Sequence, residues 1–409
     1  MNILHIRKFV LLAWLSILCA PGHTQNSVSP LVLRMPDTKA YSIVERSDWR
    51  RYDNGKYIGL VRNEVRASII PAAAAHQTSQ ATNKNDISAI YHGIYFILQS
   101  TLREMRQSAQ AVDSIIPVNF EMDRSGAVEI EDDRGFPMMR GFPFYPEQGI
   151  TQGAKWQALG SRAVDPLNKG EAIVIPFIAE YEYRGVEYNN GVPVHRINAS
   201  YGYSYLNEIT AHPYTRAAGN HKVDILIRAS DGLPLFMRDE LTETFTLSDS
   251  SRIEFRGFTL TFYSEIVPIE RETLLSSLEK TFSVETSDID FTPVPEGIRL
   301  TIRDIRFEAD SAKFLPSENI KLDLLADALK QIPDRTFLIE GHTASTGAPA
   351  NEMQLSIERA MSIVSELVKR RISASRFIYK GWGGKKPVGD NATSEGRSLN
   401  RRVEITILD

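Results

Sequence analysis

The chain has 409 residues, of which 42% are hydrophobic and 24% are charged, a composition typical of a globular protein long enough for about two or three domains. Its net charge of −4 excludes general nucleic-acid binding, which requires a clear basic excess. Its single cysteine, Cys19, excludes disulfides within the chain and sites built from several thiolates.

The N-terminus has the pattern of an export signal. Arg7 and Lys8 precede an apolar run over residues 9–19 that is too short to span a bilayer as a helix. We therefore expect residues 1–24 to be a cleaved signal peptide and the mature protein to be periplasmic, without a transmembrane span. The alternative is a lipoprotein signal in which Cys19 is acylated, which would attach the protein to the outer membrane.

Residues 25–268 are predicted to form a mostly antiparallel β domain, either a sandwich or a curled sheet. Asn, Asp and Gly tolerate the positive φ of hairpin turns, so their clusters between apolar runs mark hairpins. Such clusters occur at residues 53–55, 123–126, 189–191 and 231–232.

Residues 86–112 are predicted to form the one long helix of this N-terminal domain. Their apolar residues recur at three- and four-residue steps, which places them on one helical face. These residues are Ile87, Ile90, Tyr91, Ile94, Leu98, Leu102 and Met105. Packing against the sheet is favoured over lying on a membrane, because Lys and Arg do not dominate the polar face.

Aromatic residues are concentrated in two stretches, residues 136–156 and 181–205. One interpretation is a face that binds sugar or lipid. The alternate spacing of Tyr201, Tyr203 and Tyr205 instead favours cross-strand packing in a core, because alternate residues of a strand share a face.

After a connecting helix or linker at residues 269–282, the pattern changes to alternating strands and helices. The expected elements are a strand at 298–307, a helix with Ser317 as its N-cap, a strand at 337–340, a helix at 355–369, and strands at 376–380 and 402–408. This order predicts an α/β sandwich with helices on one face of a small mixed sheet. The chain as a whole is therefore predicted to be an α+β protein of two domains.

Several motifs recur in order within this C-terminal part. They are Phe307 with Asp310, Ser311, Ala312 and Leu315; Gly341, His342 and Thr343; Leu355, Ser356, Arg359 and Ala360; residues 381–383; residues 391–396; and residues 397–402. In these motifs, residues 283–409 resemble the OmpA-like, peptidoglycan-associating domain family. The resemblance implies a non-catalytic domain that binds the diamino acid of a peptidoglycan stem peptide.

The resemblance also implies a binding site around residues 341–347. Arg359 occupies the family position that takes the carboxylate of the ligand, and His342 and Thr343 belong to the turn that lines the site. The family aspartate that holds the ammonium of the ligand is replaced by Ala344. The family asparagine is replaced by Glu352, with Asn351 one place earlier.

Three explanations of Ala344 stay open at this point. Glu352 could supply the missing carboxylate, the ligand could be a different diamino acid, or the domain could have lost the function. Free backbone N–H groups in the turn, beside the start of a helix, would also suit an anionic group.

Residues 369–402 carry ten basic side chains, which could steer an anionic polymer or could be ordinary solvated surface. The sequence contains no metal-ligand spacing of histidines, no nucleophile elbow and no phosphate loop. We therefore expect no enzyme activity, no cofactor and no metal.

The leading hypothesis is a non-catalytic periplasmic envelope protein that contacts peptidoglycan through Arg359 and the 341–347 turn. The alternative is an envelope scaffold that has lost peptidoglycan binding and binds a protein partner through residues 41–268. A third hypothesis is carriage of a lipid or other apolar ligand by the N-terminal sheet.

Overall fold

The computed structural model describes residues 31, 39–72, 88–98, 109–167, 170, 172–206, 213–267, 269–282, 289–303, 314–332 and 335–409. The predicted signal peptide, Cys19 and the motif residues 307–312 lie outside the described residues. No helix in the described part of the chain is long and apolar enough to cross a bilayer.

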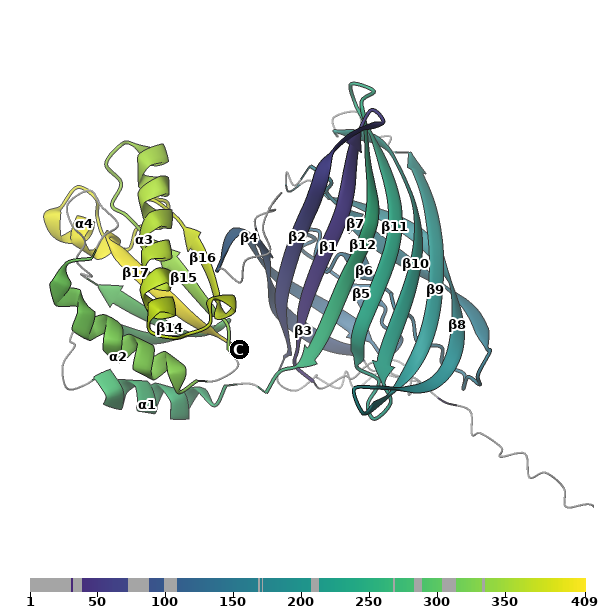
Figure 1. Cartoon of the computed structure of the whole chain (residues 1–409), viewed down its shortest axis with the longest axis horizontal. Helices are drawn as coiled ribbons and strands as arrows, with labels where there is room; N and C mark the ends of the chain where they lie inside the picture. Colours follow the sequence, from purple (N-terminus) through teal and green to yellow (C-terminus); the bar gives the residue numbers. More distant parts are fainter. Residues whose placement is uncertain are drawn as a thin grey trace, which may run out of the picture.

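The N-terminal sheet is a long antiparallel meander that curls around its own core (Figure 1). Its strands are β1 (Tyr41–Asp53), β2 (Lys56–Pro71), β3 (Ser88–Leu98), β4 (Gln110–Asp123), β5 (Val128–Glu129), β6 (Met139–Arg140), β7 (Lys155–Val164), β8 (Ile173–Asn189), β9 (Val192–Leu206), β10 (Tyr214–Arg228), β11 (Pro234–Leu247) and β12 (Arg252–Glu265). Pairing runs from β5 through β4, β3, β2 and β1 to β12, and then backwards through β11 to β6.

The predicted hairpins are confirmed, and the turn residues explain why they form. Asn54 and Gly55, between β1 and β2, have φ values of 50° and 83°. Asn190 and Gly191, between β8 and β9, have φ values of 50° and 81°. Asparagine and glycine tolerate this left-handed region, which a two-residue hairpin turn requires at both central positions.

The aromatic residues fill the inside of the curled sheet, as the alternate spacing predicted. Buried and exposed residues alternate along most of β8, so one face of this strand forms the core. Tyr181 stacks on Trp156 with ring centroids 5.1 Å apart. Tyr201 stacks on Phe177 at 4.0 Å, and Phe142, from the segment between β6 and β7, lies against both. These rings are core residues, whereas Tyr188 is exposed.

The predicted helix at residues 86–112 is wrong, and so is the α+β class predicted for the whole chain, because a large and mostly antiparallel sheet dominates the described residues. The described residues of this range form β3 and the start of β4, which pair antiparallel. Tyr91 and Tyr95 face the core of the curled sheet, whereas Ile94, Phe96 and Leu98 pack against the C-terminal part. A strand buried on both faces is a nearly continuous apolar run, which periodicity alone does not distinguish from a helix.

The C-terminal part has helices on one face of a small mixed sheet. Its elements are α1 (Arg271–Phe282), β13 (Ile289–Val294), β14 (Gly297–Arg303), η1 (Pro316–Glu318), α2 (Asn319–Lys330), β15 (Phe337–Gly341), α3 (Pro349–Lys369), η2 (Ala374–Arg376), β16 (Phe377–Gly381), α4 (Ser394–Asn400) and β17 (Arg402–Leu408). The strand order is β13, β14, β17, β15 and β16, and only β15 and β16 are parallel to each other. Residues of α1, α2 and α3 share one apolar core with the sheet.

Two helix starts differ from the prediction. The 3₁₀ turn η1 precedes α2, so Glu318 rather than Ser317 occupies the N-cap, and it makes no side-chain cap hydrogen bond. Helix α3 begins at Pro349, earlier than predicted, because proline is well tolerated in the first turn of a helix.

The two parts of the chain are joined through β4. The first residues of β4, Gln110 and Ala111, pair in parallel with β16, so β4 continues the C-terminal sheet before it enters the N-terminal one (Figure 1). Lys380 donates from Nζ to the carbonyl oxygens of Val112, at 3.3 Å, and Asp113. Ile94, Phe96, Leu98 and Val112 form an apolar cluster there with Leu338, Ile378 and Leu408.

Replacing Phe96 by alanine is expected to lower the free energy of unfolding by about 3–5 kcal/mol, because the ring is 1% exposed in the cluster that joins the two parts. Ile90→Ala on the same strand is the matched control, since Ile90 is 50% exposed, and should change the free energy by about 0.5 kcal/mol or less. Urea denaturation monitored by circular dichroism measures both. Equal effects would contradict the two-sided burial of β3.

Candidate functional site

The site region is the turn that follows β15, and backbone contacts hold it against its neighbours. The backbone N–H of His342 donates to Arg402 O and that of Thr343 to Gly383 O, both at 3.0 Å. A Cβ atom on Gly341 would lie 2.1 Å from Ser356 O, so only glycine allows the turn to approach α3 this closely.

His342 lies beneath the turn in a buried charge cluster. Its ring is 1% exposed, and its Nε2 is 3.6 Å from Oε2 of Glu404, whose Oε1 accepts from Arg402 Nε at 2.7 Å. Burial alone would raise the pKa of Glu404, but the His342 and Arg402 side chains outweigh it and lower this pKa to about 2. The arrangement makes His342 part of the support of the turn.

Glu352 stabilises the turn from the first turn of α3. Its Oε1 accepts hydrogen bonds from the backbone N–H groups of Thr346 and Ala348, and also from Thr346 Oγ1. The Thr346 N–H contributes most to lowering the pKa of the Glu352 carboxyl, and the Ala348 N–H adds to the effect. The Glu352 carboxylate is thus already engaged within the protein. Its predicted role in place of the missing family aspartate stays a prediction.

Asn391 and Asn400 shape the site, although neither was among the predicted site residues. The backbone N–H of Ser345 donates to Asn391 Oδ1 at 3.0 Å. Asn400 Nδ2 donates to the same oxygen at 2.9 Å, while Asn400 Oδ1 accepts from Val388 N and Gly389 N. In the sequence, the feature that could have identified these two residues was their place in the motifs at 391–396 and 397–402.

The expectation of free N–H groups in the turn is wrong for Ser345, Thr346 and Ala348. These N–H groups donate to Asn391 and Glu352. A ligand carboxylate would therefore depend on a side chain rather than on these backbone groups.

Arg359 lies on the face of α3 that carries Glu352. The two residues are seven positions apart, about two helical turns, so their side chains project on the same side. Between them, Ser356 Oγ accepts from the backbone N–H of Gly383 at 2.9 Å, so this face of α3 lies against the loop beside the turn. Arg359 is half-buried there, and Asn351 is exposed at the start of the helix.

The structure therefore brings His342, Thr343, Ala344 and Glu352 together around one turn. Ala344 is 5% exposed, so its methyl group is buried in the turn.

Many basic side chains of residues 369–402 are engaged within the protein. Arg370 pairs with Asp323 and Glu366, Arg376 donates to backbone carbonyls, and Arg402 pairs with Glu404. This engagement favours a structural role for part of the basic excess.

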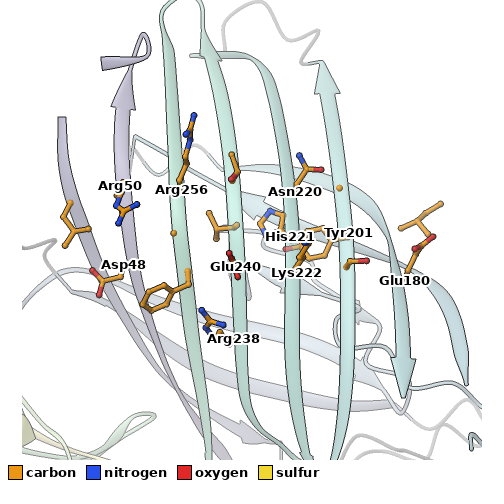
Figure 2. Close-up of a pocket in the computed structure, with 18 of the residues that line it drawn as sticks. Asp48, Arg50, Glu180, Tyr201, Asn220, His221, Lys222, Arg238, Glu240 and Arg256 are labelled. Carbon is orange, nitrogen blue, oxygen red and sulfur yellow. The ribbon is translucent and has the colours of Figure 1, made fainter. Parts of the chain in front are cut away.

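A large hollow lies elsewhere, on the outer face of the N-terminal sheet (Figure 2). It is an open groove of about 990 Å³, and its lining includes both charge signs. The charged side chains around it are Asp48, Arg50, Glu180, Lys222, Arg238, Glu240 and Arg256. Among the residues that the structure describes, no group of three or more His, Cys, Asp or Glu is placed to hold a metal ion.

Known proteins are similar to the C-terminal part of the chain. The OmpA family model matches residues 306–401. This part of the chain is similar to the OmpA family, and we call it the OmpA domain. The N-terminal sheet lies outside the match.

Relatives of the OmpA domain are envelope proteins. Outer membrane porin F from Pseudomonas aeruginosa is 37% identical over 115 residues, which cover 28% of this chain and 33% of the porin. Peptidoglycan-binding protein ArfA from Mycobacterium bovis is 38% identical over 103 residues, which cover 25% of this chain and 32% of ArfA. The chain thus matches about a third of the length of these two relatives.

A solved structure is also similar to the OmpA domain. The structure of an outer membrane protein from Borrelia burgdorferi has 33% sequence identity to this chain and a TM-score of 0.26. The match covers 30% of this chain and 100% of the Borrelia chain.

Glu352→Ala is expected to lower the free energy of unfolding by about 1–3 kcal/mol, because two backbone N–H groups lose their acceptor. Glu352→Gln should cost less, since its amide oxygen can still accept. Because the folded pKa of Glu352 is lowered, the advantage of glutamate over glutamine is present above the unfolded carboxyl pKa of about 4.3 and is lost as pH falls below it. Chemical denaturation at pH 7 and pH 3 measures the difference, and equal stability of all three proteins at pH 7 would contradict this role.

Proposed function

We propose that the protein is a non-catalytic periplasmic envelope protein whose OmpA domain binds peptidoglycan stem peptides. Arg359 takes the carboxylate of the diamino acid, and the 341–347 turn forms the wall of the site. The observation that carries the proposal is the prebuilt turn, held by Glu352 and Asn391, beside the face of α3 that presents Arg359.

The relatives support the same class of ligand. ArfA, at 38% identity, is named as a peptidoglycan-binding protein, and porin F is named as an outer membrane protein. These likenesses concern the OmpA domain alone, so the proposal assigns the contact with the wall to this domain.

The occupied N–H groups of the turn support Arg359 as the group that takes the ligand carboxylate. The N–H groups of Ser345, Thr346 and Ala348 already have acceptors within the protein. A guanidinium can instead hold a carboxylate by two parallel hydrogen bonds.

Ala344 is expected to make the binding weaker than it would be with an aspartate. A methyl group does not accept a hydrogen bond from the ligand ammonium, and loss of a charge-assisted contact costs on the order of 1.5–3 kcal/mol, about one to two decades of affinity.

Co-sedimentation of the mature protein with purified sacculi tests the proposal. Arg359→Ala should weaken binding at least about tenfold, whereas Lys369→Ala, which removes a positive charge from the end of the same helix, should leave it unchanged. Ala344→Asp should strengthen binding by about tenfold or more if the remaining pocket accepts the ammonium. Equal binding by wild type and Arg359→Ala would contradict the assigned role.

The second candidate function is an envelope scaffold in which the OmpA domain no longer binds the wall. The buried methyl group of Ala344 and the large groove on the N-terminal sheet favour it. Absence of sacculus binding by the wild type, together with a gain in Ala344→Asp, would select this candidate.

A further inference from the structure

A cavity of about 100 Å³ lies inside the curled N-terminal sheet, apart from the OmpA domain. Its walls come from β1 to β4, β11 and β12, together with the segment of residues 137–143 that lies across the interior. Most of the lining is aromatic or apolar. It includes Tyr41, Ile43, Val65, Tyr95, Phe120, Met122, Met138, Met237 and Tyr263.

Glu45 is the carboxylate that lines this cavity. A smaller hollow of about 30 Å³ adjoins it and shares Glu45, Met138 and Thr261 among its lining residues. Within the described residues, no donor forms a hydrogen bond or ion pair with the Glu45 carboxylate. Glu45 is half-buried and lines both hollows, and desolvation raises the pKa of Glu45 to about 7.

A neighbouring cluster of charges already engages Arg162, the cation that acts on Glu45. Arg162 lies 3.3 Å from Glu243 and 3.6 Å from Asp239, and His221 Nδ1 lies 2.9 Å from Asp239. Burial opposes protonation of His221, but its contacts with Asp239 and Glu243 outweigh burial and raise its pKa. Arg162 is therefore shared between Asp239 and Glu243, and its attraction for Glu45 does not offset the desolvation of that carboxyl.

We propose that this cavity binds a small organic cation, a short primary alkylammonium ion, with its ammonium group on the Glu45 carboxylate and its alkyl chain among the tyrosine and methionine side chains. A buried carboxylate is stabilised by a paired cation, and aromatic faces attract cations and accept apolar chains. A metal ion fits poorly, because the other groups that line the larger hollow are mostly apolar and the smaller one is lined by Arg162 as well as Asp239. The described residues also contain no group of three or more His, Cys, Asp or Glu placed to hold a metal ion.

The cavity volume sets the size of the ligand. A dry apolar cavity of about 150 Å³ holds benzene, which is roughly 25 Å³ for each carbon atom. The two adjoining hollows therefore suit about five non-hydrogen atoms, the size of n-butylammonium.

Binding should depend on pH, because the ammonium requires an ionised Glu45. The groups that act on Glu45 are Arg162 from β7 and Asp239 and Glu243 from β11, and Glu45 in turn acts on Tyr95 from β3 and Tyr263 from β12. The ionised fraction of a group with a pKa of about 7 rises from about one tenth at pH 6 to about nine tenths at pH 8. Affinity for the cation should rise by about tenfold over the same range.

Isothermal titration calorimetry of the mature full-length protein with n-butylammonium chloride tests the proposal. At pH 8 the wild type should bind, Glu45→Gln should bind at least about tenfold more weakly, and Glu180→Gln on the outer face should match the wild type. The uncharged isostere 1-butanol should bind at least about tenfold more weakly than n-butylammonium.

If Glu45→Gln fails to fold, two comparisons on the wild type still test the proposal. Affinity that is equal at pH 6 and pH 8, or equal for n-butylammonium and 1-butanol, would overturn it. Absence of binding at pH 8 would also overturn it and would mean that the hollows hold water only.

Discussion

The structure depends on one shared strand, β4, which belongs to both sheets. Without the pairing of Gln110 and Ala111, β16 would be an open edge of the C-terminal sheet, and open edges invite pairing with other chains. The apolar cluster around Phe96 and Ile378 covers the contact, so β3 is buried on both faces. The same contact places the OmpA domain beside the N-terminal sheet (Figure 1).

Carboxylates that are shielded from water have different surroundings in the OmpA domain and in the N-terminal sheet. In the OmpA domain, Glu352 and Glu404 are ionised and bonded within the protein, so they hold the turn in place. The proposed contact with the ligand carboxylate falls to Arg359. In the N-terminal sheet, Glu243 is paired with Arg162, whereas Glu45 lines a cavity without a hydrogen-bond or ion-pair partner among the described residues. A desolvated carboxylate without such a partner is costly, and such groups often mark binding sites.

Local chemistry made much of the fold predictable from sequence. The hairpin turns followed from Asn54, Gly55 and their counterparts, and the C-terminal architecture followed from motifs at fixed order. The predicted helix failed because burial of β3 on two faces depends on a contact with Leu338 and Ile378, which are remote in sequence. The roles of Asn391 and Glu45 depend in the same way on residues that only the fold brings near.

The most direct test of the account is a nuclear magnetic resonance titration of the isotope-labelled mature protein with a muropeptide that carries a diamino acid. The account predicts that amide shifts concentrate in residues 341–348 and in the part of α3 around Arg359, and that Arg359→Ala abolishes them. Shifts confined to the groove of the N-terminal sheet, or no shifts at saturating muropeptide, would contradict the assignment of wall binding to the OmpA domain.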